Sequence, residues 1–261
     1  MNLGTEERMD EKLNKKDLTT FTFTPMLDRP TDRPTDRPIQ LSFADCFRQQ
    51  TGRVVEPIDK KTAKQMVERI HYSKNFPGNV VYAFGLYKDG DLIGVCSYGI
   101  PASPPLCRGI AGEENKKRVL ELNRLAIEPQ FNGGNEASYL ISHSLKMLPH
   151  YTFVVSYADT GWTHIGYVYQ ATNWLYTGMT KPRTDAFCNG VHPRHQKEKK
   201  QSNLRQNRNA KHRYVYLVGD RRERKKMLSE LRYKTQPYPK GDERHYDTDN
   251  PQMAIPIQIV S

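Results

Sequence analysis

Apolar residues recur at regular spacing from about residue 58 onward, and this pattern predicts the first helices and strands. The segment after Asp59 predicts a helix with Asp59 as N-cap, because its apolar residues lie on one helical face: Ala63, Met66, Val67 and Ile70. Residues 79–100 contain two apolar runs on either side of a Lys-Asp-Gly-Asp turn at 88–91. This arrangement is typical of a β-hairpin.

The next segments alternate between irregular and extended patterns. Residues 100–115 contain three prolines and predict a loop. Residues 118–129 predict a strand, whose alternation places four residues on one face: Leu120, Leu122, Arg124 and Ala126. Arg124 therefore occupies a position at which a core residue would be expected.

The second half of the chain predicts further alternation of helices and strands. In order, these are a helix within 129–148 opened by a glycine-containing turn, a buried strand at 151–159, a helix at 164–174, a strand at 212–220 and a basic helix at 221–232. The predicted fold class is α/β, with a mixed central sheet and flanking helices.

The ends of the chain have a different composition. Residues 1–40 are polar and end in the Asp-Arg-Pro repeat of 28–38, where each proline lacks an N–H and restricts the residue before it. We interpret residues 1–40 as a flexible extension, with the repeat either a tether or without function. Residues 41–240 are the predicted domain, and 241–261 a C-terminal tail.

Positive charge is concentrated in one part of the sequence. The chain has 40 Lys and Arg against 29 Asp and Glu, a net charge of +11, and residues 181–244 alone hold 19 basic and seven acidic residues. Within this region, 192–213 has almost no apolar residue and is predicted to be a mobile or ligand-ordered loop. The segment 181–240 predicts nucleic-acid binding, the alternative being a solvated basic face. The candidate phosphate contacts are Lys197, Lys199, Lys200, Arg205, Arg208, Lys211 and Arg213.

Other classes of protein are poorly supported by the composition. No apolar run approaches the ~18 residues of a membrane span, and the N-terminus lacks the apolar region of a signal peptide. The four cysteines lie far apart and form no Cys-x-x-Cys pair, so neither a disulfide scaffold nor a zinc ribbon is indicated. We expect a soluble intracellular protein.

Three side chains stand where catalytic groups are often found. His71 and Tyr72 follow the first helix, and Asp159 ends a predicted strand, the edge at which α/β sheets bind ligands. Tyr169 lies in the following helix. Each has a structural alternative: a His at a helix C-terminus, an Asp that caps a helix, and a Tyr that belongs to the core.

A glycine-containing turn is the candidate anion site. Asn132, Gly133, Gly134 and Asn135 precede a helix, and glycines allow backbone N–H groups to approach a phosphate. Ser138 in the first turn could donate its hydroxyl group. Glu136 at the same end would repel a pyrophosphate, and an ordinary strand-to-helix turn is the alternative.

Together these segments resemble the phage Mu-type Mom DNA-modification family, within the Gcn5-related N-acetyltransferase-like superfamily. The resemblance covers roughly residues 55–240 and is carried by these stretches: 71–78, 94–101, 119–127, 135–148, 154–174 and 213–228. The most specific block is 156–174, with Tyr-Ala-Asp, His-x-Gly and Val-Tyr-Gln-Ala at fixed offsets. The loop QFNGGNEAS departs from the usual coenzyme A loop of the acetyltransferases.

The resemblance implies an enzyme that converts adenine N6 in phage DNA to an N6-carbamoylmethyl group and so blocks host restriction, acting in the host cytoplasm. It implies that the reactive centre is formed by four residues, which could be the ligands of a ferrous ion: His71, Tyr72, Asp159 and Tyr169. It also implies that Arg124 and Ser138 contribute to activity. Double-stranded DNA is the implied partner. Two alternatives stay open: a non-catalytic DNA-binding module, and an acetyl-CoA-dependent N-acetyltransferase acting on a protein or a small amine.

The expected mechanism follows from the groups involved. Adenine N6 is a poor nucleophile within the duplex, so the base must be extruded, with stacking on Tyr offsetting part of the cost. Asp159 would act as general base, and Arg124 would stabilise charge on a donor carbonyl. The donor is either acetyl-CoA, through an iron-centred route, or an activated glycyl group such as glycyl-tRNA, bound at residues 132–135.

Overall fold

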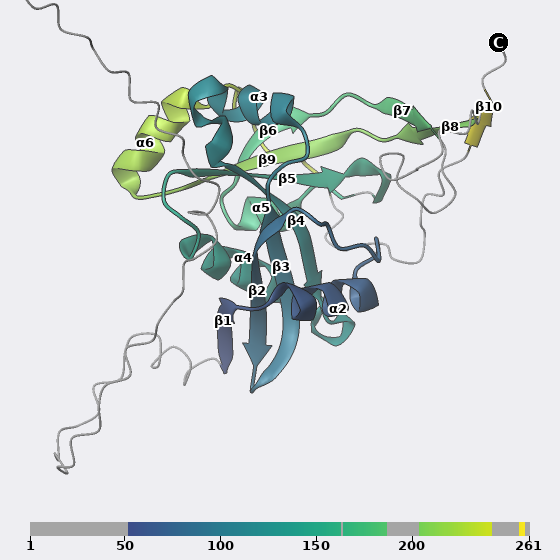
Figure 1. Ribbon diagram of the computed structural model, residues 1–261, viewed down its shortest axis with the longest axis vertical. Coiled ribbons are helices and arrows are strands. Elements are labelled where there is room, and N and C mark those ends of the chain that lie inside the picture. The colour runs from purple at the N-terminus through teal and green to yellow at the C-terminus, as the bar shows by residue number, and fades with distance from the viewer. Residues whose placement is uncertain (1–51, 163, 187–203, 242–255, 259–261) are drawn as a thin grey trace, which may run out of the picture. The chain divides into compact units, whose positions relative to one another are not determined.

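The computed structural model describes residues 52–162, 164–186, 204–241 and 256–258, and its main element is a seven-stranded sheet (Figure 1). The strand order is β1-β2-β3-β4-β5-β9-β6. Only β4 and β5 run parallel; the other neighbouring strands are antiparallel. The strands are β1 (Arg53–Pro57), β2 (Val80–Lys88), β3 (Asp91–Gly99), β4 (Val119–Ile127), β5 (Thr152–Asp159), β6 (Leu175–Met179) and β9 (Lys211–Val218).

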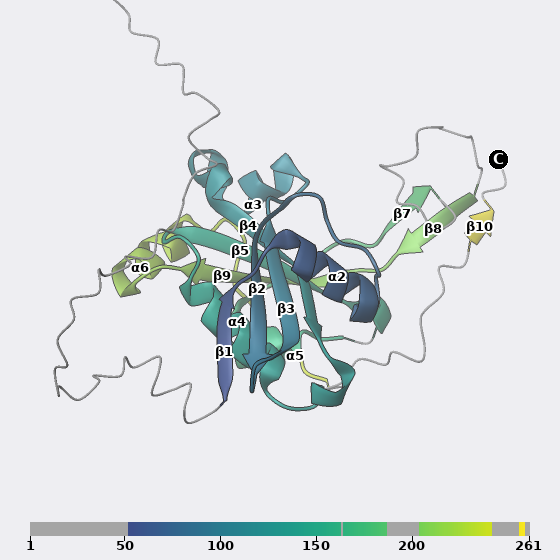
Figure 2. The same ribbon diagram turned by 60° about the horizontal axis from the view of Figure 1, so that its bottom comes forward.

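Helices cover both faces of this sheet (Figure 2). They are α2 (Lys60–Ile70), α3 (Pro104–Asn115), α4 (Glu136–Lys146), α5 (Tyr167–Ala171) and α6 (Arg221–Glu230), with the 3-10 turns η1 (Lys116–Arg118), η2 (Pro129–Phe131) and η3 (Thr160–Trp162). On one face, α2 packs on Val95 and Ala126, while α3 and α6 pack on Val119 and Val155. On the other face, α4 packs on Tyr98 among other core residues. The predicted mixed α/β class is therefore confirmed.

Several predicted elements are confirmed in detail. Asp59 caps α2, accepting hydrogen bonds from the N–H groups of Lys61 and Thr62. The hairpin turn contains Asp89 and Gly90, both with positive φ (51° and 94°), as a tight two-residue turn requires. Asp220 and Glu223 form a capping box at the start of α6.

The prediction of a proline loop at 100–115 is wrong, because Pro104 begins helix α3. Proline is tolerated in the first turn of a helix, since the N–H that it lacks would have no helical partner there. The helix is interrupted at Gly112, whose φ of 79° and ψ of 178° are not helical. The proline content of this segment therefore led to the prediction of a loop where the structure has a helix.

A bulge in β4 changes the predicted faces of that strand. Tyr98 pairs with Leu122 and Ser97 with Arg124, so Asn123 has no partner residue on β3. The extra residue reverses the alternation. As a result Leu122 faces α4 while Arg124 shares the opposite face with Ala126, so the four residues predicted on one face are divided.

In the described residues after α5, the chain forms strands other than β9 that the sequence pattern does not predict. Besides β6, the strands β7 (Arg183–Ala186), β8 (Leu204–Arg208) and β10 (Pro256–Gln258) form a second, three-stranded sheet. The prediction that residues 192–213 form a loop is therefore wrong for Leu204–Arg208, which form β8. The predicted C-terminal tail, 241–261, contains the strand β10. The predicted helix 164–174 is shortened to α5, because Gly166 has a φ of 80° immediately before it. Residues 1–40 lie outside the described residues.

Candidate functional site

The candidate site lies where the two parallel strands separate. β4 and β5 are in register only from Val119–Phe153 to Glu121–Val155, although each strand continues well beyond that point. In Figure 1 the β2–β3 hairpin and the β5–β9 pair accordingly run in different directions. Beyond the last registered pair, the Ser156 hydroxyl lies 3.0 Å from the Leu122 carbonyl oxygen and bridges the two strands. Ligands of α/β sheets bind at this carboxyl edge of parallel strands.

His71 and Tyr72 approach this region from the end of α2. The His71 Nδ1 atom lies 3.1 Å from the Ser73 N–H nitrogen and 2.9 Å from the Ser73 hydroxyl oxygen. Its ring stacks on Tyr72, with centroids 4.3 Å apart. Burial, with help from Arg124 and Lys74, lowers the pKa of His71 to about 4. A pKa this low favours the neutral imidazole at pH 7. His71 is also the C-cap of α2, as its structural alternative predicted, and its catalytic role stays a prediction.

Tyr72 presents an accessible aromatic surface. The residue is 44% exposed. Burial of its hydroxyl end and the nearby Asp159 raise the pKa of Tyr72, while Arg124 lowers it. The phenol is thus close to both charged groups and remains protonated.

Arg124 holds this segment against the sheet. Its Nε donates a 2.6 Å hydrogen bond to the Asn75 carbonyl, and one terminal nitrogen donates to the Asn123 carbonyl. Burial lowers the pKa of Arg124, whereas Tyr72 and Glu121 raise it. The bulge at Asn123 thus directs a guanidinium group toward the His71–Asn75 segment.

Asp159 ends β5 as predicted, and its carboxylate has two partners. It accepts a 2.9 Å hydrogen bond from the Gly161 N–H and forms an ion pair with Lys211, with Nζ and Oδ2 2.8 Å apart. The capping alternative is therefore correct in part, because Asp159 caps the short η3 turn. The side chain is 23% exposed, so one edge of the carboxylate stays accessible.

Tyr169 belongs to the core and also reaches the separated strands. Its ring is buried and contacts Trp174 and Tyr214, with centroids 5.1 and 5.2 Å away. The phenol oxygen lies 2.8 Å from the Ser156 hydroxyl. Burial raises the pKa of Tyr169 to about 12, so the group is a neutral phenol. Its predicted catalytic role stays a prediction.

Glu121 is a member of this cluster that the sequence analysis missed. It forms the last registered pair of β4 with β5, and it influences the pKa values of Arg124, Tyr157 and Tyr169. Burial raises the pKa of Glu121, while Arg124 and Lys211 lower it. The sequence signal was a charged residue between two leucines near the start of the predicted strand.

Ser138 and the residues 132–135 are not joined to this cluster. Ser138 lies on α4, which covers the opposite face from α2, and its hydroxyl donates to the Asn135 carbonyl. Asn135 accepts a hydrogen bond from Arg53. A Cβ atom added to Gly134 would clash with the Glu136 carboxylate, so the side chain of Glu136 folds over this turn. The proposed donor loop is therefore partly covered by a negative charge.

The four predicted metal ligands do not fit a ferrous ion. Within the described ranges no group of three or more His, Cys, Asp and Glu side chains could hold a metal. Two of the four are neutral phenols, which are poor ligands, and the Arg124 cation lies within electrostatic range of His71 and Tyr72. Asp159 is already paired with Lys211.

The basic segment is described only in part. Lys197, Lys199 and Lys200 lie outside the described residues, and Arg205 is placed only as a backbone position of β8. Arg213 differs from its prediction as a phosphate contact: its guanidinium group stacks 3.4 Å from the Tyr233 ring centroid and donates to Thr177. Arg213 is therefore a packing residue.

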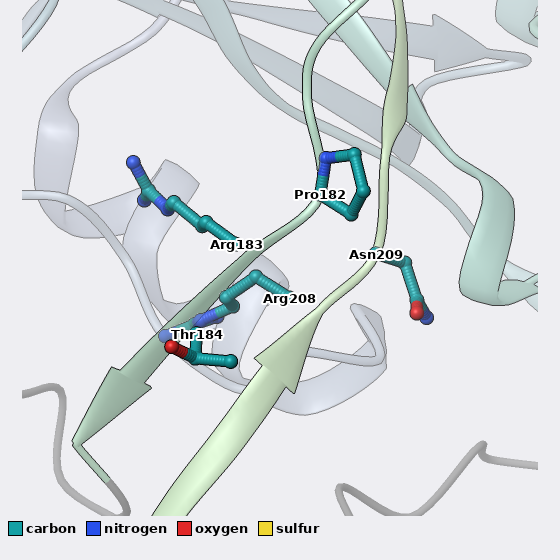
Figure 3. A pocket seen from close by; sticks show the side chains of 5 residues that line it. All are labelled: Pro182, Arg183, Thr184, Arg208 and Asn209. Atoms are coloured by element: carbon teal, nitrogen blue, oxygen red, sulfur yellow. The ribbon is translucent and has the colours of Figure 1, made fainter.

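Arg208 lies at the base of the β7–β8 hairpin beside a small pocket. The pocket has a volume of about 310 Å³ and is lined by Pro182, Arg183, Thr184, Arg208 and Asn209. Arg183 and Arg208 are register partners, and Figure 3 shows both side chains extending to the same side of the hairpin while Asn209 points away. The phosphate contact of Arg208 stays a prediction.

Sequence comparison identifies the family. The chain matches the Mom protein family over residues 53–240 and therefore belongs to it. It is 31% identical over 128 residues to the "Methylcarbamoylase mom" of Escherichia phage Mu, an alignment that covers 48% of this chain and 53% of that protein. The chain thus spans about half the length of this curated relative.

Solved structures with a similar arrangement are acetyltransferases. The ribosomal-protein-S18-alanine N-acetyltransferase from Escherichia coli has a TM-score of 0.40 at 9% identity, over 64% of this chain and 95% of that one. An N-acetyltransferase from Staphylococcus aureus has a TM-score of 0.41 at 11% identity, over 64% and 98%. Likeness at this level carries no weight for function. Among the helices in the described ranges, none has the length and apolar character needed to cross a membrane.

Proposed function

We propose that this chain is a DNA-modifying transferase that converts adenine N6 to the N6-carbamoylmethyl form, acting on phage DNA inside the host cell and protecting it from restriction. Membership of the Mom family supports this proposal, as does the name of the phage Mu relative, a methylcarbamoylase. The net charge of +11 favours a polyanionic substrate.

One observation carries the proposal: an accessible aromatic ring, a carboxylate and a guanidinium group gather where β4 and β5 separate. Tyr72 is 44% exposed and lies within electrostatic range of Asp159 and Arg124. A flipped adenine can stack on such a ring while its amino group faces the carboxylate. The cost of unstacking a base, a few kcal/mol, is offset in part by this contact.

The proton of the amino group needs an acceptor. Asp159 is the proposed general base, with Lys211 and the Gly161 N–H fixing the direction of its carboxylate. Glu121 is the second carboxylate within this cluster, and burial raises its pKa. Carboxylates with shifted pKa values are frequent at functional sites. Arg124 is the proposed partner for negative charge that develops on the donor.

The proposed donor is an activated two-carbon acyl group bound near residues 132–135. An acetyl thioester and a glycyl ester both supply two carbons, but only the glycyl group also supplies a nitrogen. After acyl transfer to N6, the glycine amine attacks the ring carbon and breaks its bond to N6, so the glycine nitrogen ends up on the ring and the original N6 becomes the carboxamide nitrogen. Feeding cells with glycine labelled with ¹⁵N and ¹³C distinguishes the two donors. Label in the modified adenine supports the glycyl route, and its absence eliminates that route.

Mass spectrometry of nucleosides tests the function itself. DNA from cells that express the chain should contain an adenine nucleoside heavier by one C₂H₃NO unit. An unmodified nucleoside profile contradicts the proposal. An unmodified profile with retained DNA binding would indicate a binding module, and acetylated proteins or small amines would indicate an acetyltransferase.

A further inference from the structure

Exposed cations from two segments gather at the end of β5 and β9 that lies away from Asp159. η1 supplies Lys117 and Arg118 immediately before β4, and α6 supplies four further residues shortly after β9; every one of them is exposed. We call this group the distal basic patch: Lys117, Arg118, Arg221, Arg222, Lys225 and Lys226. The patch lies at the end of β5 where Thr152 pairs with Val218. Asp159 and Lys211 pair at the opposite end of the same strand.

One aromatic ring joins the two segments. Arg118 and Lys226 each lie 5.3 Å from the centroid of the Tyr151 ring, and the Tyr151 hydroxyl donates a 2.8 Å hydrogen bond to Glu230. Contacts of this kind hold cationic side chains in place. Side chains that are already ordered lose less conformational freedom when an anion binds.

Three carboxylates near the patch, Glu230, Glu223 and Glu113, already have partners, and one partner of Glu230 is Lys226 of the patch itself. Glu230 accepts hydrogen bonds from Tyr151 and Asn115, and Glu223 caps α6 and pairs with His150. Glu113 on α3 pairs with Lys116. The outward charge of η1 and α6 is therefore positive, and Arg221, Arg222 and Lys225 lie within little more than one turn of α6.

We infer that the distal basic patch binds the phosphate backbone of the same DNA duplex whose adenine is modified, some distance from that adenine. The inference rests on the proposed function. A strand rises about 3.4 Å per residue, so the eight-residue β5 places the patch roughly 24 Å from Asp159. This length corresponds to about seven base pairs at ~3.4 Å each. A second contact at that spacing would hold the duplex while one base is extruded.

A charge-neutral variant with a matched control tests the inference. The variant Arg221→Gln/Arg222→Gln/Lys225→Gln removes three positive charges from the patch, and Lys60→Gln/Lys61→Gln/Lys64→Gln removes three exposed charges from α2. Binding is measured as a function of salt with an 8-base-pair and a 30-base-pair duplex, each carrying a central adenine. Circular dichroism confirms that both variants are folded.

For the 30-base-pair duplex, we expect the patch variant to reduce the salt slope by about 0.9 for each lost phosphate contact, up to about 2.7, and to weaken binding at least tenfold. Binding to the 8-base-pair duplex should be nearly unchanged, and the α2 variant should behave like the wild type. Unchanged binding of the patch variant, or an equal loss in the α2 variant, overturns the inference. Loss of binding to duplex RNA alone would assign the patch to RNA and overturn it as well.

Nucleoside analysis keeps the two proposals separate. If wild-type protein modifies adenine while the patch variant binds DNA normally, the inference fails and the proposed function stands. If the patch variant loses DNA binding but wild-type protein modifies no adenine, the proposed function fails.

Discussion

Asp159 and Lys211 lie opposite each other as a register pair of β5 and β9, and their side chains form an ion pair 2.8 Å long. This relationship connects the proposed general base to the first residue of the strand that follows the basic segment. Lys211 was predicted from sequence as a phosphate contact, and the structure gives its side chain a partner inside the candidate site. A DNA phosphate near Lys211 would therefore compete with Asp159 for the same cation.

Replacing Lys211 with Met should affect activity far more than stability. Both side chains are partly exposed, and pairs of this kind contribute about 0–1 kcal/mol to the free energy of unfolding. Loss of the cation that directs Asp159 should lower the rate of adenine modification about tenfold, which corresponds to ~1.4 kcal/mol in the barrier. Urea unfolding and nucleoside quantification measure the two effects, with Lys211→Arg as the charge-preserving control. A large loss of stability with unchanged modification would contradict a positioning role.

Replacing Glu121 with Gln should stabilise the folded protein at neutral pH. Burial raises the pKa of this carboxyl group, so its charged form is destabilising in the folded state. The folded protein binds the extra proton, and stability falls as pH rises from the unfolded pKa through the raised one. The free energy of unfolding of the variant should therefore exceed that of the wild type by a few tenths to about 1 kcal/mol at pH 7–8.

Below about pH 4 the difference between Glu121→Gln and wild type should disappear, because Glu121 is then protonated in both states. Denaturant unfolding at pH 4 and pH 8 checks this. A variant that is less stable than wild type at pH 8 would show that the Glu121 carboxylate forms a stabilising contact. If Glu121 rather than Asp159 takes the amino proton, Glu121→Gln should also abolish modification while DNA binding is retained.

Two partly buried histidines, His71 and His164, should make the fold sensitive to mild acid. Burial is the largest cause that lowers the pKa of His71 and of His164, each to about 4. The unfolded chain takes up these protons near pH 6.5, so stability should fall as pH drops from about 6.5 toward 4, by on the order of 1–3 kcal/mol for each histidine. NMR titration of the imidazole signals and unfolding at several pH values test this. A His71 signal that titrates at pH 6–7 would contradict the buried, neutral assignment.

Much of the fold follows from the sequence pattern, because its strongest elements are local. The α2 helix with its Asp59 cap and the hairpin around Asp89 and Gly90 each depend on residues that are neighbours in sequence. The α3 helix was not predicted, because proline is typical of loops as well as of the first turn of a helix. Only the structure shows that Pro104 lies in the first turn. β7 and β8 are short and polar, so only their mutual pairing identifies them as strands.

The candidate site was predicted in outline, and its geometry was not. Asp159 and His71 were identified by their positions at element ends. The bulge at Asn123, which sends Arg124 to the face opposite Leu122, arises from register with β3 and leaves no signature in the alternation of β4. The link between Tyr169 and Ser156 depends on the separation of β4 from β5, a tertiary feature.

Glu136 should limit the affinity of the turn at 132–135 for phosphate. Its carboxylate folds over Gly134 at the start of α4, where a backbone anion site would otherwise form. Glu136→Ala should strengthen binding of coenzyme A about two- to fivefold, since a charge at a helix N-terminus is worth roughly 0.3–1 kcal/mol. Isothermal titration calorimetry measures the change, with Glu68→Ala on α2 as control. Equal affinity in all three proteins would show that the donor binds elsewhere.

The central claim is that the cluster where β4 and β5 separate modifies an extruded adenine, and Asp159→Asn tests it most directly. DNA from cells that express wild-type protein or folded Asp159→Asn at equal levels is digested and its nucleosides are analysed by mass spectrometry. We predict an adenine nucleoside heavier by C₂H₃NO with wild-type protein and its loss with the variant. Equal amounts of this nucleoside in both samples, or none in either, would contradict the claim.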